Sequence, residues 1–400
     1  MPAIEMKPGI HWIGVNDRTT DLFEGLWPIT HEGVSYNSYL ILDEKKVLID
    51  LTKNSQEDAL LDQLYGQIDP ATLDYIVINH MEPDHTGALK MLHHMAPNAT
   101  LLCSPKAVPM IEAYYGITQN VRAVQDGEEI SLGEKTLQFF SIPFVHWPET
   151  IATYEKTQRV LFPCDAFGGY GALRGGIFDD QYDSMDFYVQ ESLRYYANIV
   201  ARFSRPVLMA IDKLAPLPID VIAPSHGLIW RKDPGKIVQL YQQWARYATE
   251  PGEPGVTLLY ASMYGNTEKM MNAVATGIST VGVPLTIFDA ARTHVSYILP
   301  YLWTRRGVMI GAPTYEGSLF PPMAQVLHIA AEKRIQNKKV ARFGSYGWSG
   351  GAQRMTEQLV EPLKWEWAGT LEFQGAPTAE LMRQGEAFGR EFALAIQQGT

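Results

Sequence analysis

Four side chains that can bind metal ions lie within six residues, directly after a short apolar run: His80, Glu82, Asp84 and His85. The run, residues 75–78, is rich in β-branched and aromatic side chains, which predicts a buried strand. In an extended segment the first three of these side chains share one face, while the adjacent His85 points elsewhere. Gly87 allows a turn into a following helix. We therefore expect a loop that serves two neighbouring metal ions, although each residue taken singly could cap a strand end.

Metal-capable side chains also follow later strand-like runs of the chain. In sequence order these are His146, Asp165 and His226. Such repetition is expected when a β-sandwich gathers one site from several strand ends. Other polar residues fit structural roles better: Asp50 is expected to cap a strand, and His93 and His94 are expected on a helix surface.

The composition limits the class of protein. Its 400 residues suggest two domains, and 46% hydrophobic with 19% charged residues fits a folded enzyme. The formal net charge is -11 and no basic tract is present, which argues against a nucleic-acid binder. The start lacks the apolar core of a signal peptide, and no apolar stretch is long enough to span a bilayer. A cytoplasmic protein that does not bind membranes is therefore expected.

The two cysteines, Cys103 and Cys164, are far apart in the sequence and form no C-x-x-C pair. A disulfide framework, a fused rubredoxin-type module and a zinc ribbon are therefore not expected. Both cysteines are expected to be small core residues.

The first 250 residues alternate short strand-like runs with turns and a few helical segments. We expect strands at 10–15, 38–42, 46–50, 75–78, 101–103, 128–132, 136–143, 151–154, 159–162 and 221–223. The pattern from 101 to 165 predicts strands only. Helices are expected at 56–67, 88–95, 192–203 and 206–215.

The pattern changes after residues 249–255, which are rich in Pro and Gly and predict a linker. We expect strands at 256–261, 284–288, 307–310, 339–343 and 370–373. Helices are expected at 266–278, 322–334 and 352–363, with a closing helix to about residue 395. Strands that alternate with helices in this way predict a parallel, doubly wound sheet.

Three loops at the carboxyl ends of these strands form a second candidate site, because open parallel sheets bind ligands there. The first loop, 262–267, places hydroxyl, amide and backbone N–H groups at a helix start, which suits a phosphate. It lacks the dinucleotide and nucleotide-hydrolysing motifs. Aromatic residues in the other loops can cover a flat ring, so we expect a flavin mononucleotide (FMN) site. Its candidate contacts are Ser262, Met263, Tyr264, Gly265, Asn266, Thr267, Pro313, Thr314, Tyr315, Glu316, Gly317, Ser345, Tyr346, Gly347, Trp348 and Gly350.

The motifs together resemble a known family. The first half resembles a metallo-β-lactamase domain in which H-x-H-x-D-H has become His80-x-Glu82-x-Asp84-His85, and the second half resembles a flavodoxin. Over essentially the whole chain, this combination resembles a flavodiiron protein of the minimal two-domain type. The resemblance implies an α/β chain with a metallo-β-lactamase-like αββα sandwich at 1–250. A flavodoxin-like, doubly wound, five-stranded parallel sheet is implied at 255–400.

The resemblance also implies a ligand set for a non-haem diiron centre. His80, Glu82 and His146 are expected to hold one iron, Asp84, His85 and His226 the other, and Asp165 to bridge them. Independently of the resemblance, three carboxylates with four imidazoles are harder and richer in oxygen than the ligand sets that zinc usually takes. The ligand set therefore favours iron and leaves manganese open.

Residues around the metals depart from the family in one place. The segment Phe23-Glu24-Gly25 corresponds to one in which many relatives carry a His that contacts the ligands. In this chain Glu24 replaces that His. The resemblance implies that this replacement could alter substrate preference. His31 could compensate or could be a loop residue. Tyr195 and Tyr196 are expected on a helix near the metals, where one could donate a hydrogen bond.

The resemblance implies a reductase of dioxygen to water, of nitric oxide to nitrous oxide, or of both, with electrons supplied by FMN. The expected external donor is a separate rubredoxin, or alternatively reduced deazaflavin. A head-to-tail homodimer or a dimer of dimers is expected, because the family pairs the flavin of one subunit with the irons of the next.

Two other classes remain open from the residues. One is a zinc-dependent hydrolase of the metallo-β-lactamase type fused to a flavodoxin domain, against which Glu82 and the flavin loops argue. The other is a sensor or electron carrier without catalysis, against which the complete ligand set argues.

Overall fold

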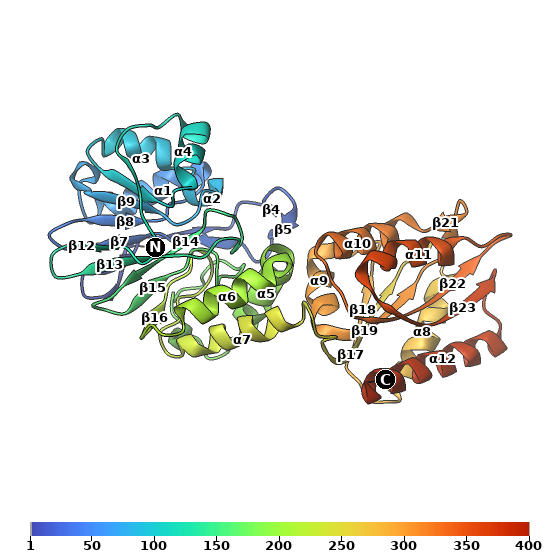
Figure 1. The fold of residues 1–400 in the computed structure, drawn as a ribbon. Helices are drawn as coiled ribbons and strands as arrows, with labels where there is room; N and C mark the ends of the chain where they lie inside the picture. Colours follow the sequence, from blue (N-terminus) through green and yellow to red (C-terminus); the bar gives the residue numbers. More distant parts are fainter. Residues whose placement is uncertain (1, 400) are drawn as a thin grey trace. The chain divides into compact units, whose positions relative to one another are not determined.

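The computed structural model describes residues 2–399, and the chain divides into two compact units, residues 1–243 and 244–400 (Figure 1). The division falls within helix α7 (Pro234–Arg246). Strand β17 (Glu253–Tyr260) starts inside the segment predicted as a linker, so only the first part of that segment is irregular. The domain limits 1–250 and 255–400 stay predictions.

The first unit contains two large sheets. One is seven-stranded in the order β1-β2-β7-β8-β9-β10-β11 and the other five-stranded in the order β12-β13-β14-β15-β16. The strands of the first are β1 (Ile4–Lys7), β2 (Ile10–Trp12), β7 (Tyr39–Ile41), β8 (Val47–Ile49), β9 (Tyr75–Ile78), β10 (Thr100–Cys103) and β11 (Val121–Ala123). The strands of the second are β12 (Glu129–Ser131), β13 (Thr136–Ser141), β14 (Ile151–Glu155), β15 (Val160–Phe162) and β16 (Val221–Ile222). Two short pairs, β3 (Val15–Asp17) with β6 (Val34–Tyr36) and β4 (Leu22–Phe23) with β5 (Trp27–Pro28), complete the unit.

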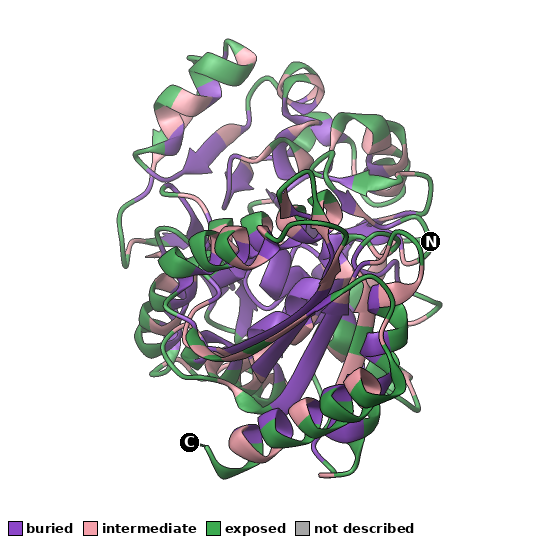
Figure 2. Ribbon diagram, turned by 90° about the vertical axis from the view of Figure 1, so that its right-hand side faces the viewer, coloured by how far each residue is buried: buried purple, intermediate pink, exposed green. Residues whose placement is uncertain are grey.

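Alternation of side chains along buried strands explains why the two sheets stack. In β8, Val47 and Ile49 join the apolar core that also takes residues of the second sheet, while Leu48 joins a second core on the opposite face. Both faces of this sheet are therefore covered, and its strands β7 and β8 are buried throughout. Figure 2 shows that buried residues gather along strands while exposed residues lie mainly on helices and loops.

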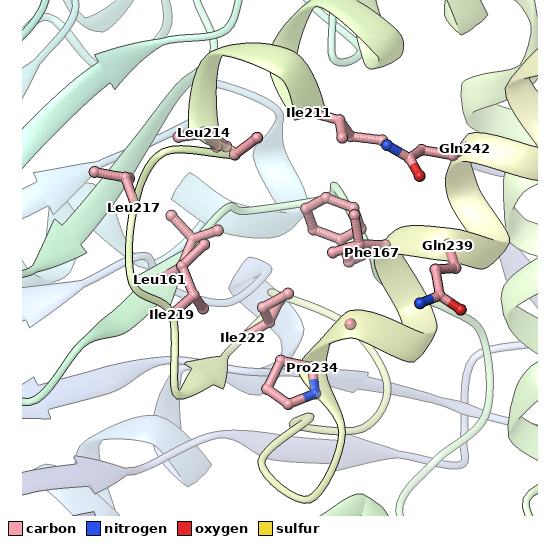
Figure 3. Close-up of a pocket in the computed structure, with 13 residues that line it drawn as sticks. Leu161, Phe167, Ile211, Leu214, Leu217, Ile219, Ile222, Pro234, Gln239 and Gln242 are labelled. Carbon is pink, nitrogen blue, oxygen red and sulfur yellow. The ribbon is translucent and has the colours of Figure 1, made fainter.

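Helices cover the outer faces of both sheets. Helices α1 (Glu57–Tyr65), α3 (Leu89–Met95) and α4 (Ala107–Tyr115) pack on the first sheet, and α2 (Pro83–Thr86) is a single turn after β9. On the second sheet lie α5 (Asp186–Tyr195), α6 (Ser204–Leu214) and α7, with an apolar cavity of about 330 Å³ between α6, α7, β15 and β16 (Figure 3). The predicted αββα sandwich is confirmed.

The second unit is a parallel sheet in the order β18-β17-β19-β22-β23. Its strands are β17, β18 (Leu285–Asp289), β19 (Arg305–Gly311), β22 (Lys339–Tyr346) and β23 (Glu366–Gln374). Its helices are α8 (Asn266–Ser279), α9 (Val295–Thr304), α10 (Pro321–Glu332), α11 (Ala352–Val360) and α12 (Ala379–Gln398). Because the order reverses at β17, a ligand of this flavodoxin-like fold is expected at the carboxyl ends of β17 and β19.

The sequence did not predict helices α4, α7 and α9, or the hairpin of β20 (Thr314–Tyr315) and β21 (Ser318–Leu319). The expectation of strands alone from 101 to 165 was wrong because α4 lies there. Proline weakened the helical pattern in α4, which contains Pro109, and in α9, which contains Pro300. Pro109 is tolerated because the first N–H groups of a helix have no intrahelical partner.

The predicted helix at 192–203 is three pieces in the structure. Its first residues belong to the last turn of α5. A π-helical turn then covers Tyr196–Val200, and a 3-10 turn covers Ala201–Phe203. No helix among residues 2–399 is long and apolar enough to cross a membrane.

Candidate metal centre and flavin site

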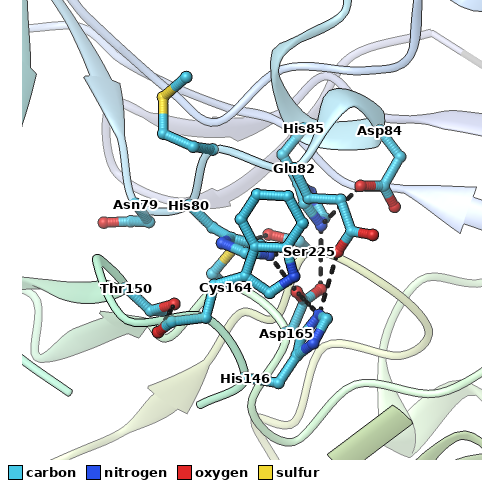
Figure 4. A network of polar contacts seen from close by, with 12 residues as sticks. Asn79, His80, Glu82, Asp84, His85, His146, Thr150, Cys164, Asp165 and Ser225 are labelled. Atoms are coloured by element: carbon cyan, nitrogen blue, oxygen red, sulfur yellow. Dashed lines mark hydrogen bonds and ion pairs between the residues drawn. The ribbon is translucent and has the colours of Figure 1, made fainter. Parts of the chain in front are cut away.

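The seven predicted metal ligands come from the ends of strands that meet at one edge of the sandwich. His80 and Glu82 follow β9, and Asp84 and His85 lie on the single turn of α2. His146 lies between β13 and β14, Asp165 follows β15, and His226 follows β16. The structure brings all seven together. Figure 4 labels six of them, His80, Glu82, Asp84, His85, His146 and Asp165.

Three of these side chains surround one oxygen of Asp165. Glu82 Oε2 lies 3.2 Å from His80 Nε2 and 3.0 Å from His146 Nε2. Asp165 Oδ2 lies 3.4 Å from each of the same two nitrogens. The four ligand atoms lie within 4.8 Å of one another, which suits a single ion.

The other three ligand side chains surround the second carboxylate oxygen of Asp165. His226 Nε2 lies 3.2 Å from Asp84 Oδ2, and His85 Nε2 lies 3.4 Å from Asp84 Oδ1. Asp165 Oδ1 lies 3.0 Å from His85 Nε2 and 3.3 Å from His226 Nε2. Asp165 therefore faces one group of ligands with each of its carboxylate oxygens.

Several of these short approaches are not ordinary hydrogen bonds. Both carboxylate oxygens of Asp84 and of Asp165 are buried without a hydrogen-bond partner, as are the Nε2 atoms of His85 and His226. Buried polar atoms in a native protein are normally paired, so a cluster of unpaired ones needs an explanation. Lone pairs that converge on common points, from a nitrogen and oxygen ligand set, fit a pair of metal ions.

Contacts outside the cluster fix two of the four imidazole rings. Glu149 Oε1 accepts a hydrogen bond from His80 Nδ1 at 2.8 Å, and the backbone oxygen of Ser35 accepts one from His226 Nδ1 at 2.7 Å. Each bond leaves Nε2 as the atom that faces the cluster, as is usual for metal-binding histidines. Asp50 accepts hydrogen bonds from Asn79 at the end of β9, which supports the expected capping role.

The charges of the cluster favour positive charge at its centre. Burial opposes ionisation of the histidines, but the surrounding carboxylates outweigh it and raise the pKa of His80, His85 and His226 to about 9. The same balance raises the pKa of His146 to about 10. Burial likewise opposes ionisation of Asp165, yet the neighbouring histidines hold its pKa well below the ordinary value. Metal ions would replace these protons.

A cavity of about 350 Å³ opens beside Glu82 and Asp84, with Glu24 in its wall. Glu24 accepts a hydrogen bond from Trp27 Nε1 at 3.0 Å. Loss of hydration around its carboxyl and the nearby Glu82 carboxylate raise its pKa to about 7, while the residue as a whole is exposed. Glu24 thus stands at the entrance to the cluster.

The remaining residues predicted near the metals lie in different surroundings. His31 is exposed in the turn after β5 and does not line this cavity. Tyr195 is buried, with its ring 5.7 Å from that of His226, and burial raises the pKa of its hydroxyl well above the ordinary value. Tyr196 bonds to Ser204 at 2.7 Å.

The predicted histidine and cysteine roles outside the cluster agree with the structure. His94 is exposed, and His93 is half-buried on α3. Cys103 and Cys164 are free and buried. Cys164 precedes Asp165 and accepts a hydrogen bond from Ser225 at 3.4 Å.

In the second unit, the first and third predicted flavin loops touch. Gly265 caps the start of α8, and its N–H donates to Ser262 Oγ at 3.0 Å, which shapes the first loop. Thr267 Oγ1 lies 3.1 Å from Ser345 Oγ in the third loop. Hydroxyl groups from two loops thereby gather at the N-terminus of α8, which suits a phosphate.

The second and third loops also approach closely. The N–H of Ala352 donates to Thr314 Oγ1 at 3.4 Å. A Cβ atom on Gly351 would lie only 2.0 Å from the backbone oxygen of Gly317, so this approach needs glycine. Glu316 and Gly317, both with positive φ, form the turn between β20 and β21.

Large aromatic and apolar side chains stand exposed on these loops. Tyr264 is 91% exposed and Trp348 90%, while Tyr315 and Met263 are 40% and 39% exposed. Exposed apolar groups gathered around a polar cradle mark a binding surface. Rings beside a phosphate-type cradle fit a flavin nucleotide.

Comparison with known proteins agrees with the presence of two units in the chain. Residues 34–227 match the family described as ODP family beta lactamase, and residues 258–388 match flavodoxin. A nitric oxide reductase of Moorella thermoacetica is 34% identical over 98% of this chain and 96% of its own. An anaerobic nitric oxide reductase flavorubredoxin of Pectobacterium atrosepticum is 36% identical over 98% of this chain and 77% of its own.

Solved structures extend the likeness to the whole fold. The rubredoxin oxygen:oxidoreductase of Desulfovibrio gigas superposes with a TM-score of 0.93 over 99% of both chains, at 29% identity. The flavodiiron protein of Giardia intestinalis has a TM-score of 0.93 over 100% of this chain and 97% of its own, at 27% identity. The chain belongs to the flavodiiron protein family.

As a flavodiiron protein, the chain is an oxidoreductase whose cofactors are FMN and a non-haem diiron pair. The comparisons favour this activity over the alternative of a zinc-dependent hydrolase. The predicted family, fold and enzyme class are confirmed.

Sequence reasoning missed the groups that orient the ligands of this flavodiiron protein. Glu149 and Ser35 lie 69 and 191 residues from the histidines that they bind. Glu149 follows His146 by three residues, but no local spacing rule links it to His80. Only the fold brings these pairs together.

Proposed function

We propose that this flavodiiron protein reduces nitric oxide to nitrous oxide, dioxygen to water, or both. The names of its relatives, nitric oxide reductase and rubredoxin oxygen:oxidoreductase, support both substrates. The observation that carries the proposal is the position of Asp165, whose two oxygens each face a separate set of ligands. A carboxylate in this position suits a bridge between two adjacent metal ions.

The proposed ligand assignment follows the two groups around Asp165. His80, Glu82 and His146 would hold one iron, Asp84, His85 and His226 the other, and Asp165 would bridge them. A paired iron centre supplies electrons and Lewis acidity to a diatomic ligand. Glu149 and the Ser35 carbonyl would keep the imidazoles of His80 and His226 in the orientation that binding needs.

The proposed FMN contacts are those of the three loops. Ser262, Asn266 and Thr267 would bind the phosphate at the start of α8. Thr314, Tyr315, Gly347 and Trp348 would line the ring, with further contacts from Met263, Tyr264, Gly265, Pro313, Glu316, Gly317, Ser345, Tyr346 and Gly350. The exposure of Tyr264 and Trp348 and the contacts between loops support this assignment.

Glu24 is proposed to influence which gas is preferred. Its carboxyl is in the wall of the cavity beside Glu82, where it can hold a proton or a water molecule near arriving substrate. Comparison of Glu24→Gln and Glu24→His should show a changed ratio of nitric oxide to dioxygen turnover. An unchanged ratio in both variants would assign Glu24 a structural role. His31 is not retained in this role, because it is exposed and outside the cavity wall.

The proposed electron donor and assembly are those expected for a member of this family. A separate rubredoxin is the proposed electron donor, with reduced deazaflavin as the alternative. The Desulfovibrio gigas relative supports rubredoxin, because that protein is named for rubredoxin and matches over 99% of both chains. A head-to-tail homodimer, or a dimer of such dimers, and a cytoplasmic location belong to the same proposal. Sedimentation of the FMN-loaded protein tests the assembly, and a monomer with full steady-state turnover would contradict it.

Anaerobic reduction followed by separate addition of each gas tests the function. We expect rapid reoxidation of the flavin by at least one gas, with nitrous oxide or water as the product. In Asp165→Ala, turnover should be lost while the flavin absorption spectrum is kept. Wild-type turnover in this variant would show that the chemistry occurs elsewhere. If the wild-type protein binds zinc, has hydrolase activity and consumes neither gas, the zinc-dependent hydrolase would be the correct assignment instead.

A further inference from the structure

A second cavity of the C-terminal unit lies at the amino ends of β19, β22 and β23. Its volume is about 540 Å³, and it is lined by Pro251, Arg306, Asn337, Lys338, Lys339, Lys364, Glu366 and Gly399. The flavin loops occupy the opposite, carboxyl edge of the same sheet. Since β19 covers Arg305–Gly311, the two edges are about 20 Å apart. The cavity is therefore separate from the flavin site.

Lys338 is the most buried cation of this cavity, with 1% of its surface exposed. Its Nζ donates to the backbone oxygens of Trp303 at 2.8 Å and of Pro251 at 3.2 Å. Among residues 2–399 it forms no ion pair with a carboxylate. When protonated, the ammonium group has three N–H donors, so one remains for a ligand in the cavity, and an anion bound there would favour the protonated form.

Two more cations share the cavity without a carboxylate partner in the described part of the chain. Arg306 Nη1 donates to the backbone oxygen of Ile396 at 3.4 Å, while Arg306 Nε is buried without any hydrogen-bond partner. Lys364 also lines the cavity and is absent from the ion pairs among residues 2–399. The one carboxylate of the wall, Glu366, is already paired with Lys339 at 2.5 Å.

Three cations that share one cavity without carboxylate partners are unfavourable unless a negative charge neutralises them. Like charges that share a partly buried site repel one another, and a buried charge costs free energy when it is unpaired. Burial, with the nearby charge of Arg306, lowers the pKa of Lys338 to about 7. The chain as a whole carries a formal net charge of -11, so a concentration of unpaired cations is not a general property of its surface.

We propose that this cavity binds a phosphate-type oxyanion, either as a free ion or as the phosphate group of a larger molecule. Arg306 Nε, the remaining Lys338 donor and Lys364 Nζ supply charged donors, and charge-assisted hydrogen bonds to such oxygens are the strong kind. The cavity volume falls in the range of small-molecule sites, about 300–1,000 Å³, so it has room for more than a free ion.

Calorimetric titration of the FMN-loaded holoenzyme tests the proposal, because bound FMN fills the phosphate loop at α8. The probes are inorganic phosphate and adenosine triphosphate, at constant ionic strength with chloride as the background anion. We expect saturable binding that is about tenfold weaker in Lys364→Gln and in Lys338→Met. The matched control is Lys236→Met, which removes an exposed lysine of α7 and should bind as the wild type does.

Tighter binding of the triphosphate, with the same sensitivity to both variants, would identify a larger phosphorylated ligand. Equal binding of both probes would identify the free oxyanion. Absence of saturable binding, or binding that is equal in wild type, Lys364→Gln and Lys338→Met, would overturn the proposal. Lys364 lies near the surface, so its variant keeps the test valid if Lys338→Met fails to fold.

Discussion

The carboxylate of Glu149 accepts a hydrogen bond from His80 Nδ1 at 2.8 Å, in a pair that is fully buried. The same oxygen accepts the N–H of Met81 at 2.9 Å, so Glu149 fixes both the ring and the backbone where β9 ends. As a result His80 Nε2 faces Glu82 and Asp165, where a metal would lie. The precision of the metal centre thus depends on a residue that is not itself a ligand.

Substitution Glu149→Gln should weaken iron binding by about ten- to a hundredfold, because the amide cannot stabilise the His80 imidazole as the carboxylate does. Chelator competition with the purified protein measures the change. Glu129→Gln, at an exposed surface pair with Lys156, is the matched control and should bind iron normally. Unchanged affinity in Glu149→Gln would show that the hydrogen bond has no role in holding iron.

Substitution Gly351→Ala should weaken FMN binding at least tenfold. Gly351 has a φ of 150°, and an added methyl group would lie 2.0 Å from the backbone oxygen of Gly317, which forces the second and third loops apart. Fluorescence titration of the apoprotein with FMN measures the affinity. The control is Gly235→Ala on α7, outside the flavin loops, where the nearest atom to an added methyl is an Asp233 side-chain oxygen at 3.3 Å, so the FMN affinity should be unchanged. Equal affinities in wild type and Gly351→Ala would refute the loop assignment.

Asp17→Asn should destabilise the N-terminal unit at neutral pH by about 1–3 kcal/mol. Asp17 is buried, pairs with Lys53 at 2.5 Å and accepts hydrogen bonds from Thr19 and Thr20. Burial opposes its ionisation, but these contacts outweigh burial and hold its pKa below the ordinary value of 3.8. The contribution is therefore present above pH 3.8 and falls as the pH drops through the lower pKa of the folded state. Urea unfolding at pH 7 measures it, and equal midpoints for the two proteins would contradict the prediction.

Lys338 should make the stability of the C-terminal unit rise with pH. Its pKa is lowered from the ordinary value of 10.5 to about 7, so between these values the unfolded chain binds a proton that the folded chain does not. The free energy of unfolding therefore increases from pH 7 towards pH 10.5. In chloride buffer without phosphate, the wild type should gain stability relative to Lys338→Met over this interval. A difference that stays constant with pH would show that Lys338 keeps its proton when folded.

Local patterns were sufficient for those parts of the site that lie close together in sequence. His80 to His85 could be recognised because strand, turn and ligand positions fall within one short segment, and the following helix is correctly placed. The parallel sheet of the C-terminal unit also followed from alternating strands and helices. The helices that contain Pro109 and Pro300 were missed because proline interrupts the periodicity on which such predictions depend.

Long-range contacts account for what the sequence could not predict. Glu149 meets His80, and the Ser35 carbonyl meets His226, only after the two sheets have packed. The cation cavity is a similar case. Arg306 lies at the start of β19, Lys338 precedes β22 and Lys364 precedes β23, so the three become neighbours only at the edge of the finished sheet. None of these three residues belongs to a motif that could be recognised from its own segment.

Mössbauer spectroscopy of protein reconstituted with the Mössbauer-active isotope of iron tests whether each chain holds a bridged pair of irons. The position of Asp165 between two sets of ligands predicts two iron sites in each chain, with their spins coupled through a bridge. Asp165→Ala should lose the coupling while it retains FMN. A single isolated iron in the wild-type protein, or zinc in both positions after growth with ample iron, would contradict the assignment of a diiron centre.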